Sequence, residues 1–164
     1  MLTIASIKTP IGKLNLITKE GTLLAAGFSS IEQLKQRLAV ADYELGFRSA
    51  KSVTGITDNL SDYFDGDLKA LEKIPVRQPG GEFSQKAWRA MRGTKAGKTI
   101  SYAQLANKAG SPAAVRAAGS ACAKNLIAIV VPCHRIVKTG GELGNYAYGL
   151  KNKEWLLRHE GALK

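Results

Sequence analysis

Strand-like and helix-like segments occupy different parts of this chain, and their separation limits the folds it can adopt. Apolar runs at residues 2–7, 13–18 and 23–28 predict three short strands, with Pro10-Ile11-Gly12 and Glu20-Gly21 as the turns between them. Most later apolar residues recur at helical spacing. We therefore expect an α+β fold that begins with a small antiparallel sheet.

The start of the first helix and the end of the first domain are marked by short sequence signals. Ser29 and Glu32 have the spacing of a capping box, which predicts a helix start. Residues 65–81 are rich in Gly and Pro. Such a composition predicts a connection between two domains.

The second half of the chain predicts mainly helices, interrupted by one strand. Ser101 and Gln104 form a second capping-box pattern. Ser111 followed by Pro112 predicts the N-cap and first position of another helix. The apolar run at 127–131 predicts a buried strand.

The charge of the chain points to a polyanionic partner. The net charge is +11 and the pI about 9.8, with an ordinary hydrophobic content of 45%. Such an excess favours nucleic acid or a membrane surface, and a plain basic surface is the alternative. No apolar stretch reaches the roughly 20 residues that span a bilayer, and the first ten residues lack a secretory pattern. We expect an intracellular, cytoplasmic protein, in which Cys122 and Cys133 are reduced thiols without the spacing of a zinc site.

The tetrad Pro132-Cys133-His134-Arg135 is the strongest candidate for chemistry. A thiol becomes a nucleophile when a neighbouring base takes its proton, and His134 is a candidate base. Adjacent residues on a straight strand point to opposite faces, so the pair works together only if the chain turns at Pro132. The alternative is that Cys133 is a buried packing residue, which is also what we expect of Cys122.

A histidine that acts as a base needs a partner to fix its tautomer, and that partner is usually a carboxylate. Glu160, next to the second histidine, His159, is a candidate. On spacing alone, a surface charge is the more common interpretation of Glu160.

The two helices expected within residues 101–125 have the pattern of a DNA-binding pair, with an ordinary helical hairpin as the alternative. The second helix is rich in small side chains, so it could enter a groove with Arg116 reaching between bases. Tyr102 could contact a phosphate. Five further cations could neutralise the DNA backbone: Arg92, Lys95, Lys98, Lys108 and Lys124.

The Gly-rich loop at 139–149 could form the wall of a pocket for a planar ligand, or act as a flexible linker.

Residues 82–162 as a set resemble the O6-alkylguanine-DNA alkyltransferase family. The motifs that carry the resemblance are Ser101-Tyr102-x-Gln104-Leu105-Ala106, Val115-Arg116-Ala117, Asn125, residues 129–135, Gly144-Asn145-Tyr146 and residues 153–161. Residues 1–81 resemble the family's N-terminal domain only in layout. The resemblance implies an RNase H-like domain at 1–78 and a helix-turn-helix, alkyl-acceptor domain at 79–164.

The resemblance also implies direct-reversal DNA repair. Cys133 would take the alkyl group from O6 of a flipped guanine, once and irreversibly, without a cofactor or metal; O4-alkylthymine is left open as a second lesion. The implied catalytic set is Cys133, His134, Glu160, Asn125, Tyr102 and Lys153. The implied DNA contacts are Tyr102, Arg116, Ala117, Ala118, Gly119, Ser120 and Lys124. The implied pocket wall is Val131, Pro132, Asn145, Tyr146, Ala147 and Tyr148.

Each implied role is specific. His134 would act on Cys133 through a water, Glu160 would hold His134, and Asn125 would brace the turn that carries the cysteine. Tyr102 and Lys153 would lie near the flipped base and help to supply a proton to the leaving guanine.

The sequence departs from the family pattern at Tyr148-Gly149, where many members have Gly-Gly. A bulky side chain there is expected to narrow the pocket for large alkyl groups.

The expected partner is alkylated double-stranded DNA, bound by a monomer, with cooperative assembly left open. Three alternatives remain: a non-catalytic binder of alkylated DNA, a helix-turn-helix regulator, and a Cys–His hydrolase.

Overall fold

The computed structural model describes all 164 residues, which form two compact units. The first unit consists of Met1–Pro79 together with Leu126–Val130, and the second of Gly80–Asn125 together with Val131–Lys164. Residues 126–130, which the sequence predicts in the second domain, pack within the first unit. The chain therefore leaves the second unit and returns to it immediately before the tetrad at Pro132.

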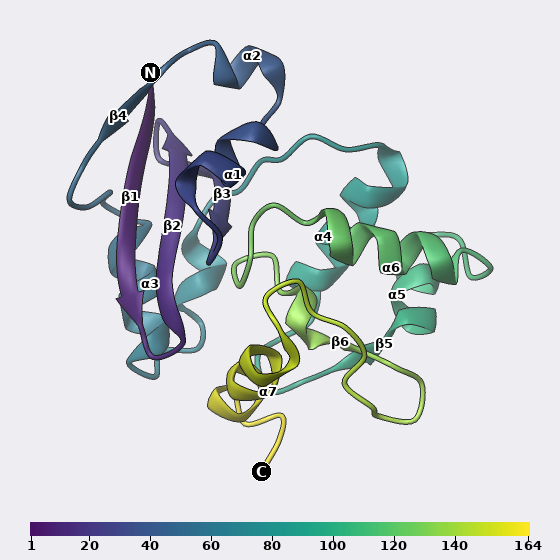
Figure 1. The fold of residues 1–164 in the computed structure, drawn as a ribbon. Helices are drawn as coiled ribbons and strands as arrows, with labels where there is room; N and C mark the ends of the chain where they lie inside the picture. Colours follow the sequence, from purple (N-terminus) through teal and green to yellow (C-terminus); the bar gives the residue numbers. More distant parts are fainter. The chain divides into compact units, whose positions relative to one another are not determined.

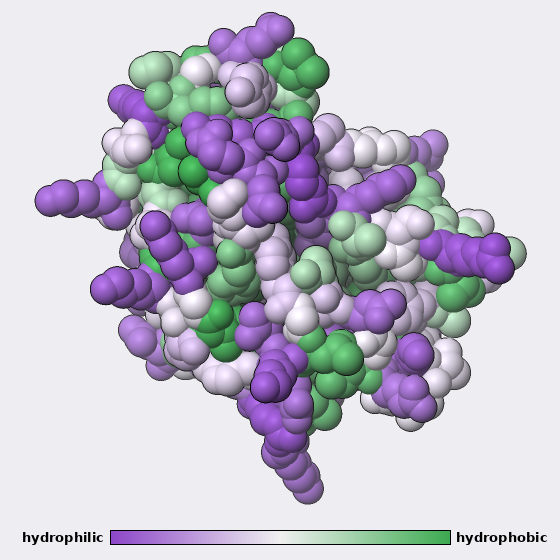
Figure 2. Space-filling view, in the orientation of Figure 1, coloured by the Kyte–Doolittle hydropathy of each residue, from purple (hydrophilic) through white to green (hydrophobic).

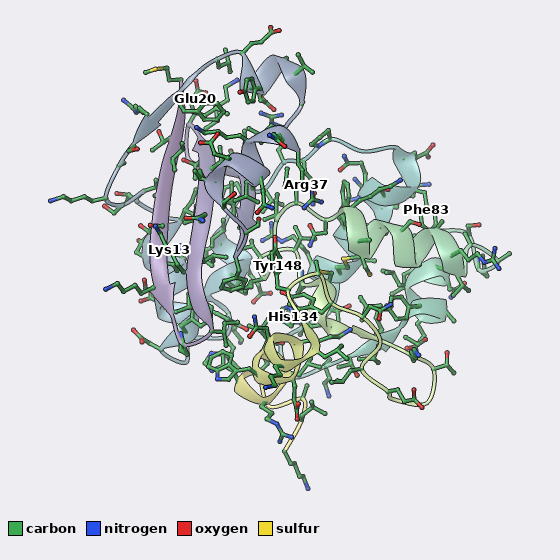
Figure 3. The ribbon with its side chains drawn as sticks, viewed as in Figure 1. Lys13, Glu20, Arg37, Phe83, His134 and Tyr148 are labelled. Carbon is green, nitrogen blue, oxygen red and sulfur yellow. The ribbon has the colours of Figure 1, made fainter.

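A four-stranded sheet forms the centre of the first unit (Figure 1). Its strands are β1 (Leu2–Thr9), β2 (Gly12–Lys19), β3 (Thr22–Gly27) and β4 (Phe47–Ser49). The predicted antiparallel meander of β1, β2 and β3 is confirmed, and β4 adds to β1 in parallel, which gives the order β3-β2-β1-β4. Glu20 (labelled in Figure 3) and Gly21 both have positive φ, at 50° and 80°, as the tightest hairpin turns require.

Helices cover both faces of this sheet. Figure 1 shows α1 (Ile31–Gln36) in front of the sheet and α3 (Thr57–Phe64) behind it. Two shorter helical segments, α2 (Val40–Tyr43) and the 3-10 helix η1 (Ala70–Lys73), lie in the connections. One cluster of buried side chains joins the sheet to α1 and to the returning segment: Leu2, Ile17, Leu24, Ala25, Leu34, Leu38 and Leu126. The mixed α+β class predicted from the sequence is confirmed.

The first helix begins one residue later than predicted. Ser30 and Gln33 form the capping box of α1, in place of Ser29 and Glu32. The Nδ2 atom of Asn15 donates to the carbonyl of Ser29 at 2.8 Å. This bond holds Ser29 to the neighbouring strand, so the next serine becomes the cap.

The prediction of a strand at residues 127–131 is wrong. Only Ile127 bridges to β3, where Ala26 forms two backbone hydrogen bonds of 2.9 Å with the residues on either side of Ile127. Ile129 then has a φ of 71°, and a hydrogen bond of 2.8 Å joins its two neighbours. These are features of a γ-turn, which reverses the chain. The run is apolar because all of its residues are buried, although it does not extend a sheet.

The second unit is mainly helical. Its elements are α4 (Glu82–Gly93), β5 (Ile100–Ser101), α5 (Tyr102–Lys108), α6 (Val115–Lys124), the 3-10 helix η2 (Cys133–Arg135), β6 (Ile136–Val137) and α7 (Leu150–His159). The helix α4 packs against both α5 and α6, and the indole of Trp88 donates to the carbonyl of Ala121 at 2.9 Å. The short strands β5 and β6 pair in parallel, with Ser101 opposite Val137, which places the start of α5 beside the end of β6.

The capping box predicted at the start of α5 is confirmed. The predicted start of α6 at Ser111 and Pro112 is wrong, because α6 begins at Val115. The carbonyl of Ser111 accepts the N–H of Ala114 at 2.9 Å and so closes a separate turn before the helix. The helix is entered from Ala114, which has no polar side chain to cap it.

None of the helices has the length and the apolar composition needed to cross a lipid bilayer. The face shown in Figure 2 carries mostly hydrophilic and intermediate side chains, with hydrophobic ones in small separate groups. Long hydrophilic side chains project from it at several places, in keeping with the excess of 24 Lys and Arg over 13 Asp and Glu.

Candidate active site

A tight turn sets the position of Cys133. The N–H of Cys133 donates to the carbonyl of Val131 at 2.8 Å, across Pro132, whose φ of −83° and ψ of 68° are those of an inverse γ-turn. The turn that the sequence required at Pro132 is therefore present. Cys133 is the first residue of η2 and only 8% exposed, so the thiol and His134 lie on a helical turn.

Asn125 fixes the same turn from the end of α6. Its Nδ2 atom donates to the carbonyl of Val131 at 2.8 Å, and the side chain is buried. The carbonyl of Val131 thus accepts from both Asn125 and Cys133. Burial raises the pKa of the Cys133 thiol, while a hydrogen bond from Asn125 and the ammonium of Lys153 oppose that rise.

His134 and Glu160 form a buried pair. Their Nε2 and Oε2 atoms lie 2.8 Å apart, and both side chains are inaccessible to solvent. Figure 3 shows His134 beside α7, the helix that Glu160 follows. The alternative that Glu160 is a surface charge is wrong, because the residue is only 3% exposed.

Arg135 completes this cluster. Its guanidinium donates from Nε and Nη2 to the two oxygens of Glu160, at 2.9 Å each, and from Nη1 to the carbonyl of Thr94 at 2.7 Å. Burial by itself would raise the pKa of Glu160, but His134 and Arg135 outweigh it and lower that pKa well below its ordinary value. Glu160 is therefore ionised at neutral pH.

The ionised Glu160 decides which nitrogen of His134 carries the proton. Burial lowers the pKa of His134, and Glu160 opposes this shift only in part, so the ring is neutral at pH 7. A carboxylate accepts only, so Nε2–H donates to Glu160 and Nδ1 has the free lone pair. Nδ1 is buried and has no hydrogen-bond partner in the protein. It is the ring atom free to accept a proton.

Cys133 forms part of the wall of a cavity of about 660 Å³. One side of the cavity comes from the start of α5 and one face of α6: Tyr102, Val115, Arg116, Gly119, Ser120, Cys122 and Ala123. The other side comes from η2 and the Gly-rich loop: Cys133, Lys138, Gly144, Asn145, Tyr146 and Ala147. Most of these side chains are small or apolar, as suits a planar organic ligand.

Lys153 lies inside the protein, where it holds the wall of the cavity. Its Nζ atom donates to the carbonyls of Ile136 at 2.6 Å and Asn145 at 3.0 Å, and the residue is fully buried. It also lies 6.0 Å from the ring centroid of Tyr102. Tyr102 is half-buried, and a backbone hydrogen bond from Asn145 opposes the rise that burial causes in its pKa. A Cβ atom at Gly144 would lie 2.9 Å from the Tyr102 hydroxyl, so that position requires glycine.

The residues expected to contact DNA are divided between the two sides of α6. Arg116, Gly119 and Ser120 line the cavity, and Lys124 is exposed. Ala118 is fully buried, on the side of the helix that packs within the unit, so it cannot contact DNA.

Comparisons with known proteins agree on one family. Residues 82–162 match the model described as 6-O-methylguanine DNA methyltransferase, DNA binding domain. The chain is 38% identical over 161 residues to the methylated-DNA–protein-cysteine methyltransferase of Shigella flexneri, covering 96% of this chain and 94% of that protein. The chain belongs to the methylated-DNA–protein-cysteine methyltransferase family.

Relatives of this family reach from bacteria to mammals. The Homo sapiens protein of the same name is 36% identical over 168 residues, covering 95% of this chain and 79% of the human protein. The crystal structure of Mycobacterium tuberculosis OGT in complex with DNA matches with a TM-score of 0.80 and 29% identity, covering 98% of this chain and 93% of that one. The fold of this methyltransferase-family chain is therefore the mixed α+β fold of solved members.

Three residues of the expected pocket lie outside the cavity wall. Val131 and Pro132 are buried behind Cys133, and they shape the turn without lining the cavity. Tyr148 is also absent from the wall, and its ring packs edge-on against Tyr146 with the centroids 5.9 Å apart. The side chain expected to narrow the pocket therefore packs against Tyr146, which does line the cavity.

Two features of the site were not predicted from the sequence: Arg135 as the second partner of Glu160, and Cys122 as part of the cavity wall. No spacing links Arg135 to a carboxylate 25 residues later. A signal for Cys122 did exist, because Val115, Gly119 and Cys122 fall on one helical face with Arg116.

Proposed function

We propose that this chain repairs DNA by direct reversal, moving the methyl group of O6-methylguanine irreversibly to the sulfur of Cys133. The observation that carries the proposal is the buried Glu160–His134 pair, 2.8 Å apart, next to a cysteine in the wall of a cavity. A base with a fixed tautomer beside a thiol is the arrangement needed to generate a thiolate on demand.

DNA would enter through α5 and α6, acting as a helix-turn-helix. The target oxygen faces the interior of the duplex, so the nucleotide has to rotate out into the cavity, at a cost of a few kcal/mol. The exposed face of α6 carries Gly119 and Ser120, which allow close approach to the minor groove. Arg116 is exposed at the rim of the same cavity and would occupy the space that the nucleotide leaves.

The proton of Cys133 would pass to Nδ1 of His134 through a water molecule. Burial keeps the pKa of the thiol high, so the free protein holds an unreactive thiol. Glu160 stabilises the imidazolium that forms, because Arg135 keeps Glu160 ionised throughout. Asn125 positions the turn that carries the sulfur.

The thiolate then attacks the methyl carbon, the C–O bond breaks, and the guanine leaves. Tyr102 lines the cavity and is the candidate donor of a proton to the leaving base. Lys153 would act indirectly, by holding the loop at Asn145 and by its charge. The product is a thioether, and no group in the cavity is able to cleave it, so each molecule would act once.

A single domain of RNase H-like layout would precede this acceptor domain, with the boundary near residue 79. The protein would act as a monomer in the compartment that holds DNA.

Mass spectrometry of the intact protein tests the proposal directly. After mixing with duplex DNA that contains O6-methylguanine, the protein should gain the mass of one methylene unit, located at Cys133 by peptide mapping. Cys133→Ser should bind the DNA and gain no mass. Binding without any mass gain in the natural protein would show a damage-recognition protein and overturn the transfer.

A further inference from the structure

The cavity contains both cysteines of the chain. Cys122, near the end of α6, and Cys133, at the start of η2, each form part of its wall. Both are free thiols. Burial raises the pKa of Cys122 to about 12, and a charge on Cys133 adds to this rise. The two thiols are therefore close enough to interact electrostatically. The repair reaction uses one sulfur only, so the second thiol has no role in it.

We propose that Cys122 and Cys133 together bind a soft monovalent cation, Cu(I), as a two-coordinate dithiolate. Thiolates select soft ions such as Cu(I). No histidine, aspartate or glutamate lines the cavity, and no group of three or more such residues in the chain is placed to hold a metal. A tetrahedral ion such as Zn²⁺ would lack half of its ligands here, whereas Cu(I) is satisfied by two sulfurs.

The charge near the two thiols also favours a monovalent ion. The ammonium of the buried Lys153 acts on both sulfurs, lowering the pKa of Cys122 and of Cys133 against the effect of burial. Binding would release two protons and leave one negative charge, because two thiolates surround one Cu⁺. That charge is balanced by the single ammonium, whereas a divalent ion would form a neutral complex and leave Lys153 uncompensated.

The consequence for repair rests on the proposed function, whereas the binding itself does not. Cu(I) on Cys133 would block the acceptor sulfur and part of the space for the flipped base. Conversely, a methyl group on Cys133 converts the thiolate to a neutral thioether, which removes one of the two ligands. Copper binding and methyl transfer should therefore exclude each other.

The test is a competition for Cu(I) between the reduced full-length protein and a coloured Cu(I) chelator such as bicinchoninate, without oxygen. The protein should withdraw one equivalent. Cys122→Ser and Cys133→Ser should each lower the affinity by about 10²-fold or more, because the second ligand of a pair adds about that factor. X-ray absorption at the copper edge should show two sulfur ligands and no nitrogen or oxygen.

A second arm avoids any folding defect of the variants. Natural protein already methylated at Cys133 should lose copper binding to the same extent as Cys133→Ser. Repair should be compared with and without Cu(I) in the natural protein and in Cys122→Ser, so that any effect of Cys122→Ser on its own cancels. If methyl transfer fails while one Cu(I) still binds through both cysteines, only the proposed function is lost. Copper binding that survives in Cys122→Ser overturns the dithiolate site. So does a mass loss of two hydrogens without copper uptake, because it marks a disulfide between the two cysteines.

Discussion

Arg135 and Glu160 form a two-pronged ion pair in the interior of the second unit, with Nε and Nη2 of the arginine each 2.9 Å from a different carboxylate oxygen. The same carboxylate accepts from His134. Arg135 therefore fixes the charge of Glu160, and Glu160 fixes the tautomer of His134. The geometry next to the thiol depends on a residue that does not itself reach the cavity.

Removing the arginine should leave Glu160 buried without a full partner. We expect Arg135→Leu to lower the free energy of unfolding by about 3–5 kcal/mol, as for other broken buried pairs. Urea unfolding measures this change. Arg158→Leu is the matched control, because it breaks an exposed pair with Glu154, at 2.7 Å, and should cost less than about 1 kcal/mol. Equal losses of unfolding free energy in the two variants would show that the buried ion pair stabilises the protein no more than the exposed one.

Replacing the carboxylate of Glu160 should slow the reaction more than it harms the fold. In Glu160→Gln the amide can donate as well as accept, so it no longer holds the proton of His134 on Nε2. We expect the methyl-transfer rate to fall by roughly 10²–10⁴-fold, as for other carboxylates that orient a histidine. Single-turnover assays on methylated duplex measure this rate, with Glu154→Gln as the exposed control. A rate within twofold of the natural protein contradicts the proposed proton transfer from Cys133 to His134.

The stability of the protein should fall as the pH falls. The folded-state pKa of Glu160 lies below its unfolded value of about 4.3, so its contribution is complete above that value and is lost as the pH falls towards the folded-state pKa. His134 acts in the same direction, because burial lowers its pKa and the unfolded chain takes up a proton first, from about pH 6.5 downward.

Urea unfolding between pH 8 and pH 3 checks this dependence. The acid limb should be less steep in Glu160→Gln than in the natural protein. An unfolding free energy that stays level or increases from about pH 7 to pH 5 would contradict the neutral, buried state of His134.

Local signals along the chain predicted most of the fold. The three strands of the meander and the capping box of α5 depend on residues a few positions apart, and these predictions are confirmed. The segment at 127–131 was misread because a continuous apolar run indicates burial, and burial does not distinguish a strand from a buried turn. Neither the positive φ of Ile129 nor the return of residues 126–130 to the first unit has a local signature.

The candidate site was predicted unevenly, for a similar reason. His134 and Glu160 were paired because each needs what the other offers, and the structure places them in contact. The family resemblance implied that Lys153 lies near the flipped base. Its burial between the carbonyls of Ile136 and Asn145 depends on two distant segments, which no spacing rule reveals.

The internal position of Lys153 gives a prediction of its own. Lys153→Met removes both hydrogen bonds and leaves the buried carbonyl of Ile136 without that donor, so unfolding should become easier by about 1–3 kcal/mol. The carbonyl of Asn145 is only part-buried, so the loss of its bond should add less. The loop at 138–147 should exchange its amide hydrogens faster. The pKa of Cys133 should also rise, because an opposing ammonium is lost. Hydrogen exchange and the pH dependence of iodoacetamide labelling measure these effects. Lys151→Met, an exposed lysine on the same helix, is the control and should change neither.

Arg116 should matter for duplex DNA and little for a free base. If its side chain fills the space of the extruded nucleotide, Arg116→Ala should slow transfer from methylated duplex by about tenfold or more, which corresponds to part of the few kcal/mol that flipping costs. Transfer from a free O6-alkylguanine base, which needs no flipping, should change by less than about twofold. Arg89→Ala, an exposed arginine on α4 outside the cavity wall, controls for the loss of one positive charge. Equal slowing on duplex and free base would place Arg116 in the binding of guanine itself, and the proposed extrusion role would then be wrong.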